Sequence, residues 1–378
     1  MADAIEIIPL SRAPADVLRF LKVSYGIYRN DPYWVAPLLS DLKKVFTDEN
    51  PLFQHAEVAL WVARRGGQDA GRIAGVLDRH HNETQRDNAA FFGFFECVND
   101  AAVSRQLFAA CFDWARQKGA RHVLGPMNPT MNDECGLLVD GFDSPPVFMM
   151  TYNPAYYAQL VTAEGFQKAK DLLAYHLDIR SCPFDRLSRI AEKVRRRNPE
   201  VTLTAIRRAT LVRDLVKVKE VYNAAWQDNW GFVPMTDAEI DFMAGRLKPL
   251  LVEGLVWVAE TKTEPVGFLL ALPDFNTALQ PLRGSLLTPK LLGFVPYLLG
   301  WKHPSCCRVI TLGVKESYRN RGLEAAMLTE GLKTGFKIGF KDAEASWILE
   351  DNTSMCRLLE TYGARVYKTY RLYERQMA

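Results

Sequence analysis

The spacing of apolar residues in the first half of the chain alternates between strand and helix patterns. Runs rich in Val, Ile and Phe predict strands, and three such runs in succession predict an antiparallel meander. One predicted helix has an apolar stripe and stops at Gly119, a residue type common at helix C-termini. The expected elements are a helix at 12–28, strands at 57–63, 71–77 and 89–98, a helix at 103–118, a strand at 121–125, a helix at 154–164 and a strand at 172–179.

The second half repeats this order of elements. Its expected elements are a strand at 201–206, helices at 211–226 and 237–251, strands at 255–261, 266–272 and 308–314, a helix at 322–338, a strand at 343–349, a helix at 354–362 and a strand at 365–373. A repeated order predicts two copies of one α/β unit, each built on a mixed sheet. We therefore expect domains at 1–180 and 201–378.

The stretch 181–200 joins the two expected domains and is rich in positive charge. Its basic residues are Arg189, Lys193, Arg195, Arg196 and Arg197. Two interpretations stay open: a solvated linker helix, or a basic contact with an anionic ligand.

The composition is that of an ordinary globular protein with a packed interior. The chain has 378 residues, of which 48% are hydrophobic and 24% charged, and this length favours two domains. Because 47 basic and 44 acidic residues leave a net charge of only +3, we expect no nucleic-acid partner. The seven cysteines are scattered without C-x-x-C spacing, so we expect reduced thiols and no metal site. Acidic residues near the N-terminus and the lack of a basic segment before an apolar one predict a cytoplasmic location.

The range 282–301 is apolar where a connection between two strands is usually short and polar. Pro289, Lys290 and Pro296 interrupt it, so no run is long enough for an ordinary transmembrane helix. The stretch fits a hydrophobic cap on the other domain, and it also fits peripheral contact with the inner membrane surface or the wall of a lipid tunnel. The aromatic residues that could line such a tunnel, as alternatives to core positions, are Trp226, Trp230, Phe232 and Trp301.

The turn after the strand at 308–314 carries the clearest chemistry. An apolar strand leads into a basic turn with Gly322, and the turn opens a helix. The first N–H groups of a helix have no partner inside it and point outward, so they favour an anion such as phosphate. Arg319 and Arg321 add positive charge, and Gly322 lets a ligand approach the backbone. From the residues alone, an anion site and a plain surface loop are both open.

The pattern Val314-x-x-x-Tyr318-Arg319-x-Arg321-Gly322-Leu323-x-Ala325 resembles motif A of the GNAT superfamily, whose turn holds the pyrophosphate of an acyl-coenzyme A. Glu324 stands where that motif usually has Gly or Ala. A later segment with Asn352 and Gly363 resembles the superfamily's second conserved helix. The resemblance implies acyl-CoA as co-substrate, and the residues expected to bind it are Leu312, Val314, Arg319, Asn320, Arg321, Gly322, Leu323 and Asn352.

The resemblance extends over nearly the whole chain to bacterial tandem GNAT proteins. It is carried by phrases such as Asp31-Pro-Tyr-Trp-Val-Ala-Pro-Leu38, Gly125-Pro-Met-Asn-Pro-Thr130 and Tyr152-Asn-Pro-Ala-Tyr-Tyr157. These proteins are acyl-CoA N-acyltransferases, and some are associated with ceramide synthesis. The resemblance implies acyl transfer to a primary amine, with a long-chain sphingoid base as one acceptor. A non-catalytic coenzyme A-binding protein and a membrane-peripheral scaffold stay open as alternatives.

Three residues are candidates for acid–base catalysis. Glu134 lies in the polar loop 128–136, and Asp274 follows the strand at 266–272 near the expected reacting centre. The family's tyrosine that often protonates the leaving thiolate falls on Leu359 here, and Tyr362 is the nearby substitute. Polar residues of the loop also build turns, and Asp274 also fits a cap at a strand end. Two prolines in 125–130 remove N–H donors, so we expect the first domain to be a degenerate copy that binds no coenzyme and helps to form the acceptor pocket.

Overall fold

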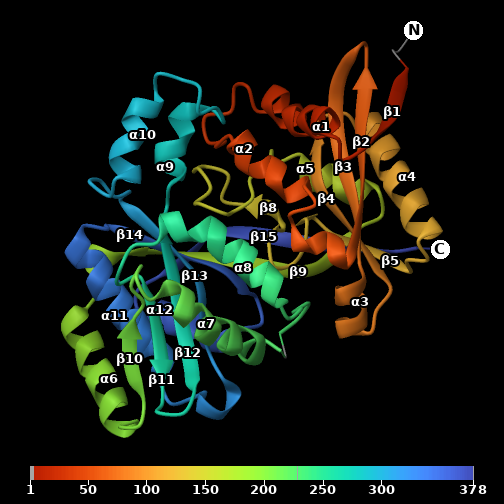
Figure 1. Ribbon diagram of the computed structural model, residues 1–378. Coiled ribbons are helices and arrows are strands. Elements are labelled where there is room, and N and C mark those ends of the chain that lie inside the picture. The colour runs from red at the N-terminus through yellow and green to blue at the C-terminus, as the bar shows by residue number, and fades with distance from the viewer. Residues whose placement is uncertain (1–3, 228, 378) are drawn as a thin grey trace. The chain divides into compact units, whose positions relative to one another are not determined.

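The computed structural model describes residues 4–227 and 229–377 (Figure 1). The chain forms two compact units. Unit 1 consists of Met1–Leu172, Leu279–Pro289 and Lys368–Ala378, and unit 2 of Leu173–Ala278 and Lys290–Tyr367. This division differs from the expected boundaries at 180 and 201, because each half of the chain contributes segments to the unit built mainly by the other half.

Unit 1 is built on a sheet with the strand order β1-β2-β3-β4-β5-β15. The strands are β1 (Ile5–Leu10), β2 (Ala56–Arg65), β3 (Gln68–Asp78), β4 (Ala89–Cys97), β5 (His122–Gly125) and β15 (Arg365–Gln376). The antiparallel meander expected from the sequence is present as β2-β3-β4, and β4 and β5 are parallel. Strand β1, which the apolar pattern did not predict, pairs antiparallel with β2.

Helices cover both faces of the unit 1 sheet. The helices are α1 (Pro14–Ile27), α2 (Leu39–Leu42), α3 (Arg79–Gln85), α4 (Ala101–Gln117) and α5 (Tyr157–Ala163). Helix α4 buries Leu107 and Phe108 against one face, and α1 buries Phe20 and Leu21 against the other. The segment after β5 contains three short strands: β6 (Met127–Asn128), β7 (Glu134–Cys135) and β8 (Leu137–Asp140).

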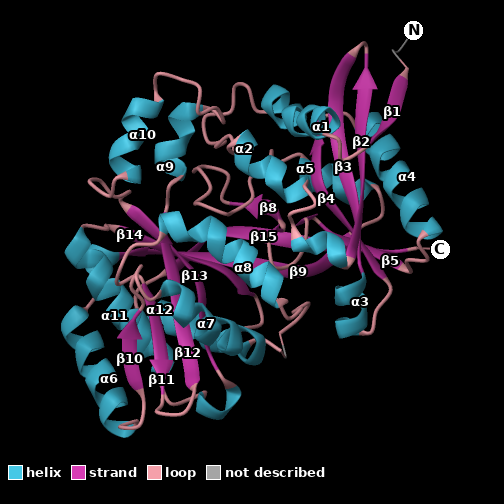
Figure 2. Cartoon of the chain, in the orientation of Figure 1, coloured by secondary structure: helices cyan, strands magenta, loops and turns pink. Residues whose placement is uncertain are grey.

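Unit 2 repeats this architecture with the strand order β10-β11-β12-β13-β14-β9. The strands are β10 (Thr202–Ala205), β11 (Val256–Glu260), β12 (Pro265–Pro273), β13 (Cys306–Val314), β14 (Asp342–Leu349) and β9 (Gln167–Asp178). The first four are antiparallel, and β13 and β14 are parallel, as β4 and β5 are in unit 1. The duplication expected from the sequence is therefore confirmed (Figure 2).

The helices of the second half are α6 (Phe184–Arg197), α7 (Leu211–Ala225), α8 (Asp237–Leu247), α9 (Asn276–Leu279), α10 (Leu291–Leu298), α11 (Leu323–Ile338) and α12 (Thr353–Thr361). Helix α6, which lies in the stretch expected to be a linker, packs against α11 and buries Leu187, Ala191 and Val194 in the core of unit 2. Its basic residues occupy the outer face, which explains why the stretch looks like a solvated linker in the sequence. Among the described residues, no helix combines the length and the apolar character needed to cross a membrane.

The last strand of each half completes the sheet of the other unit. Directly after β9, the Ile179 amide donates to the carbonyl of Lys341, the residue before β14, at 2.8 Å within unit 2. In β15, Tyr373 pairs with Gly125 of β5 within unit 1. Arg371 of β15 also forms a two-pronged ion pair with Asp171, with N···O distances of 2.7 and 2.9 Å. Each sheet therefore depends on residues far away in the sequence.

We expect deletion of 368–378 to destabilise unit 1, although the deleted residues end the second half of the chain. The deletion removes the fully buried Tyr370 and Leu372 and leaves Asp171 without its Arg371 partner. Hydrogen–deuterium exchange should rise in α4 and change little in α11. A full-length Val366→Ser variant, altered at an exposed position of the same strand, is the matched control. An increase confined to α11 would contradict the exchange of strands.

Candidate functional site

Strands β13 and β14 pair over only part of their length. The parallel ladder runs from Cys306 opposite Asp342 to Val309 opposite Ala345 and then stops. On its other side, β13 is bulged, because Leu270 and Ala271 of β12 face Thr311 and Val309 and leave Ile310 as the extra residue. From 310 to 314, β13 therefore pairs with β12 alone in the described part of the chain. The two strands part beyond this point, and one edge of β13 has no strand partner among the described residues.

A buried polar network lies where the strands part. The Arg308 guanidinium donates to the hydroxyl and the carbonyl of Ser346, at 2.9 and 3.0 Å. The Ser346 hydroxyl donates to one carboxylate oxygen of Glu344, and the Tyr367 hydroxyl donates to the other. Arg308, Glu344 and Ser346 are all buried, and Glu344 is only 1% exposed. The guanidinium thus bonds a β14 carbonyl just beyond the last paired residue, where the ladder to β13 has ended.

The turn after β13 presents backbone N–H groups at the start of α11. Asn320 and Gly322 both have left-handed backbone angles, with φ of 63° and 81°. Gly322 precedes the helix and gives it no side-chain cap, so the first N–H groups of α11 have no partner inside the helix. A Cβ atom at Gly322 would lie 2.9 Å from a methyl carbon of Val194 in α6, so both the backbone angle and the packing require glycine.

Charged side chains surround this turn. Arg319 donates to the carbonyl of Ala225 at the end of α7, at 2.8 Å. Arg321 pairs with Glu200 at 3.1 Å, and its guanidinium lies over the ring of Tyr318. Burial raises the pKa of Glu324, while hydrogen bonding to its own backbone N–H and the nearby Arg319 charge act in the opposite direction. The turn therefore combines a helix N-terminus and two arginines with the Glu324 carboxylate, which opposes an incoming anion, and with Glu200, which pairs with Arg321.

The residues expected to bind the coenzyme all lie in unit 2. Leu312 and Val314 belong to the part of β13 beyond its ladder with β14, and Arg319 to Leu323 form the turn. The Asn352 side chain accepts a hydrogen bond from the Met355 amide at 3.1 Å and so caps α12. The structure therefore gives Asn352 a local role at a helix start.

The three expected acid–base residues lie in different surroundings. The Tyr362 hydroxyl donates to the Ala325 carbonyl and is hydrogen-bonded to Thr329, both at 2.8 Å, and burial raises its pKa to about 12. Asp274 is 5% exposed and accepts a hydrogen bond from the Asn276 amide at 3.1 Å. Glu134 is exposed on β7 in unit 1, whereas the other two lie in unit 2.

Sequence reasoning missed Arg308, Glu344, Ser346 and Tyr367. A signal was present, because Glu344 and Ser346 alternate with Ala343 and Ala345 in a strand of the sheet interior. Ala343 and Ala345 face the core under α11, so Glu344 and Ser346 point to the opposite face.

The aromatic residues expected near a tunnel lie in different surroundings. Trp226 packs over Gly313 and Phe268, Phe232 packs on Tyr222, and Trp301 is 78% exposed.

In unit 1, the position that corresponds to the unpaired edge of β13 is occupied by a segment of unit 1 itself. Its parallel strands β4 and β5 pair from Ala89 opposite His122 to Phe91 opposite Leu124. Beyond that point the chain's own segment β6 lies against β4: the Phe94 amide donates to the Asn128 side chain at 2.6 Å. A Cβ atom at Gly93 would lie 1.7 Å from the Met127 carbonyl oxygen, so the two backbones are in direct contact. The position in unit 1 that corresponds to the β13 edge is therefore filled from within.

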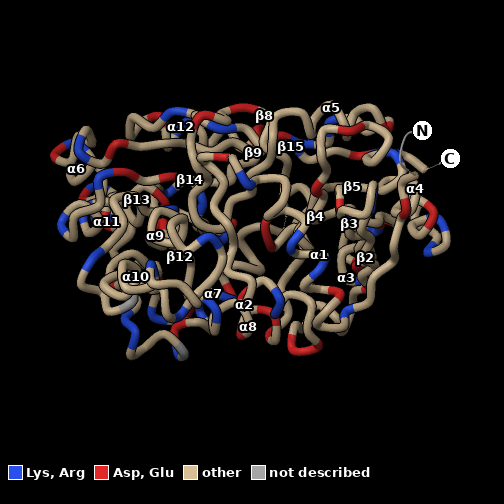
Figure 3. The backbone as a smooth tube through the Cα atoms, turned by 90° about the horizontal axis from the view of Figure 1, so that it is seen from above, with Lys and Arg blue, Asp and Glu red and all other residues tan. Residues whose placement is uncertain are grey.

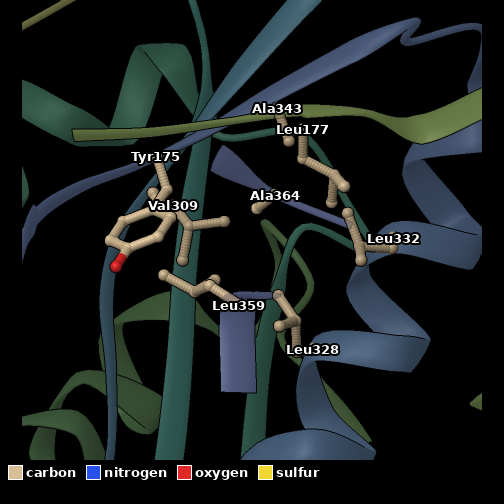
Figure 4. Close-up of a pocket in the computed structure, with 9 residues that line it drawn as sticks. Tyr175, Leu177, Val309, Leu328, Leu332, Ala343, Leu359 and Ala364 are labelled. Carbon is tan, nitrogen blue, oxygen red and sulfur yellow. The ribbon is translucent and has the colours of Figure 1, made fainter. Parts of the chain in front are cut away.

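A small hollow inside unit 2 belongs to the core rather than to this site. Nine residues line it, and they come from β9, β13, β14, α11, α12 and the residue before β15. They are Tyr175, Leu177, Val309, Leu328, Leu332, Ala343, Ala345, Leu359 and Ala364. Figure 4 shows their side chains, in which the Tyr175 hydroxyl is the single oxygen and points away from Leu332 and Leu328. Such an apolar lining offers no group to orient a polar ligand.

The chain thus forms a duplicated mixed sheet, and unit 2 has parted parallel strands next to a basic turn at a helix start. Residues 215–364 match the acetyltransferase (GNAT) family. Over 384 residues the chain is 35% identical to the bacterial ceramide synthase of Caulobacter vibrioides (strain NA1000 / CB15N), covering 99% of this chain and 98% of the relative. It is 34% identical to protein YghO of Escherichia coli (strain K12), covering 96% of this chain and 93% of the relative. The chain belongs to the GNAT acyltransferase family.

Solved structures share the whole fold at low sequence identity. A tandem GNAT protein from the clavulanic acid biosynthesis pathway superposes with a TM-score of 0.61 at 14% identity, covering 99% of this chain and 98% of the other. A GCN5-related N-acetyltransferase from Sphaerobacter thermophilus superposes with a TM-score of 0.52 at 13% identity, covering 98% and 95%. These similarities support the tandem fold of the entire chain.

We expect Arg308→Met to lower the free energy of unfolding by about 3 kcal/mol, because Glu344 and Ser346 would stay buried without the guanidinium. Urea denaturation followed by circular dichroism measures this change. Adding Glu344→Gln should recover part of the loss, since no buried carboxylate then remains. The matched control is Arg357→Met at an exposed position of α12, which should stay within about 0.5 kcal/mol of the parent. Equal effects of the two arginine substitutions would count against the network.

Proposed function

We propose that this protein transfers an acyl group from coenzyme A to the primary amine of a long-chain acceptor, with a sphingoid base as the acceptor class. The observation that carries the proposal is the unpaired edge of β13 leading into the uncapped start of α11. Two further facts support it: the chain belongs to the GNAT family, and the relative that is similar over nearly its whole length is named a bacterial ceramide synthase.

The residues at the turn fit a diphosphate group. The backbone N–H groups of the first helical turn, before the Ala326 amide that donates to the Gly322 carbonyl, have no partner inside the helix, and Gly322 adds no side chain that would block a close approach. Arg319 and Arg321 supply positive charge at the same turn. The free edge of β13 at 310–314 offers backbone donors and acceptors to the amide groups of a pantetheine arm.

Bound acyl-CoA supplies a thioester carbonyl that a neutral amine attacks, forming an amide bond and releasing the thiol. Backbone N–H groups of the β13 edge are suited to stabilise the negative charge that develops on the carbonyl oxygen. The ammonium group of the acceptor must first lose a proton to a base. Asp274 is our candidate for this base, because its backbone amide bonds the Cys306 carbonyl at the start of β13, at 2.9 Å. Glu134 and Tyr362 stay predictions for acid–base roles.

A non-catalytic coenzyme A-binding protein is the second candidate function. It is favoured by two departures from the family motifs, Glu324 in the basic turn and Leu359 at the position of the family's tyrosine. Leu359 lies on α12 with its side chain buried in the core of unit 2, and a leucine side chain has no acidic proton to donate. Turnover separates the two candidates.

The test is an assay of the purified full chain with acyl-CoA donors of short and long chain length and with sphinganine or a short alkylamine. We expect thiol release that depends on the amine, together with an N-acyl product detected by mass spectrometry. Calorimetry with coenzyme A should give one site per chain, because unit 1 fills its own gap.

Arg319→Ala should raise the KM for acyl-CoA roughly tenfold, the loss expected for one charge-assisted contact, with a smaller effect on the KM for the amine.

The control for this assay is Arg180→Ala, which removes an exposed arginine that pairs with Asp178 away from the turn. Its kinetic constants should equal those of the parent. Coenzyme binding without any amide product would support the non-catalytic alternative. An Arg319→Ala enzyme with unchanged coenzyme affinity would remove Arg319 from the site.

We expect Glu324→Gln to tighten coenzyme A binding near pH 8, since the variant lacks the carboxylate that opposes an anion at the helix start. Burial raises the pKa of Glu324, so in the parent protein this carboxylate is neutralised as the pH falls through that raised pKa, and affinity should increase. The affinity difference between parent and variant should therefore be large at high pH and shrink at low pH. Calorimetry from pH 5 to 8 measures it. Glu360→Gln, at an exposed position of α12, should show no such pH-dependent difference.

A further inference from the structure

Exposed apolar side chains are concentrated in one segment of the chain. Half of the large hydrophobic residues that are exposed in the described part of the chain lie between 286 and 301: Leu286, Leu287, Leu292, Leu299 and Trp301. The last three belong to unit 2, on α10 and in the turn that follows it. Leu292 and Trp301 are each 78% exposed, and Leu299 is 54% exposed. We call Lys290, Leu292, Leu299, Trp301 and Lys302 the α10 surface.

Helix α10 is anchored by its opposite side. Phe294 is buried and packs edge-on against Phe275, with ring centroids 6.5 Å apart. Its ring also stacks with Tyr297 at 6.4 Å. Leu292 and Leu299 are seven residues apart, which places them on one face of the helix, away from this anchor. The exposed leucines are therefore held outward by a packed helix (α10 in Figure 1).

The charged residues within this segment are all basic. The sequence contains no Asp or Glu from 275 to 315. Lys290 precedes α10, and Lys302 follows it with its ammonium 5.1 Å from the ring centroid of Tyr297. Elsewhere acidic and basic residues are interspersed along the chain (Figure 3). An apolar helix face flanked by lysines, with a tryptophan at its end, is the composition of a segment that lies in the interface of an anionic bilayer.

We propose that the α10 surface docks unit 2 on an anionic lipid bilayer, with Leu292, Leu299 and Trp301 in contact with the acyl chains and Lys290 and Lys302 at the phosphates. A second copy of this chain fits the surface less well, since a symmetric contact would bring two sets of lysines together without any acidic residue of the segment to offset them. The inference goes beyond the proposed transfer reaction, and lipid binding can be measured without turnover.

Flotation of the full chain with large unilamellar vesicles tests the proposal. The anionic vesicles contain phosphatidylethanolamine and about 40% phosphatidylglycerol, which gives them a strongly negative surface. We expect the protein to float with these vesicles at low ionic strength and to be released by salt. With phosphatidylcholine alone, at least a tenfold smaller partition coefficient is expected. The variant Leu292→Ser/Trp301→Ser should lose at least tenfold in partitioning onto the anionic vesicles.

The matched control is Val216→Ser/Val366→Ser, which alters two exposed apolar residues outside the α10 surface and should bind vesicles within twofold of the parent. Thermal unfolding of both double variants is measured as well, to check that each variant is folded. Unchanged flotation of Leu292→Ser/Trp301→Ser, or no flotation of the parent on anionic vesicles, overturns the proposal. A dimer of the parent in sedimentation velocity that the variant abolishes would assign the surface to a second copy and also overturn it. Vesicle binding by a parent that forms no amide would refute the proposed reaction and leave the docking surface intact.

Discussion

The early end of the ladder between β13 and β14 is the constraint on which the site depends. Parallel strands that part inside a sheet leave backbone carbonyl and N–H groups that need other partners. On the β14 side, the Arg308 guanidinium donates to the Ser346 carbonyl. The Glu344 carboxylate accepts hydrogen bonds from the Ser346 and Tyr367 hydroxyls. On the β13 side, the edge from 310 to 314 has no strand partner among the described residues. One strand is thus stabilised by its own polar network, and the other is left for a ligand.

The comparison of the two units shows how one duplicated architecture supports a single site. Both units contain a parallel pair followed by a helix, and in both the ladder stops after a few residues. In unit 1 the Asn128 side chain and the Met127 backbone take up the edge of β4, and the turn after β4 opens α4, whose first N–H groups are capped by the Asp100 side chain. Unit 2 has instead a glycine and two arginines at the corresponding turn after β13. The prolines at 126 and 129, expected from the sequence to mark this difference, lie after β5 and so not at the matching turn.

The order of helices and strands could be predicted from the sequence, because most of them carry an apolar face with a clear period. Strand β1 was missed, since Ile5–Leu10 is an edge strand whose residues are mostly half-buried. The exchange of β9 and β15 could not be found locally, because a strand's partner is set by packing far away in the sequence. Within the site, the basic turn with Gly322 could be predicted from its residue types. The buried positions of Arg308 and Glu344 could not be predicted, because a charged residue indicates the surface until its partners are known.

The connection before β13 distinguishes the two units further. In unit 1 the strands β3 and β4 are joined by residues 79–88, which form only α3, whereas in unit 2 the connection between β12 and β13 runs from 274 to 305. Part of this longer connection, Leu279–Pro289, packs in unit 1, where the Gln280 side chain donates to the Pro32 carbonyl at 2.9 Å. The rest carries the α10 surface and then leads directly into Cys306, the first residue of β13. The insertion begins at Asp274 and ends at the strand whose free edge forms the site. Both ends of the connection are fixed at the start of β13, because the Asp274 amide donates to the Cys306 carbonyl at 2.9 Å. The α10 surface is therefore attached at each end to the strand that forms the site, a feature that the shorter connection in unit 1 lacks.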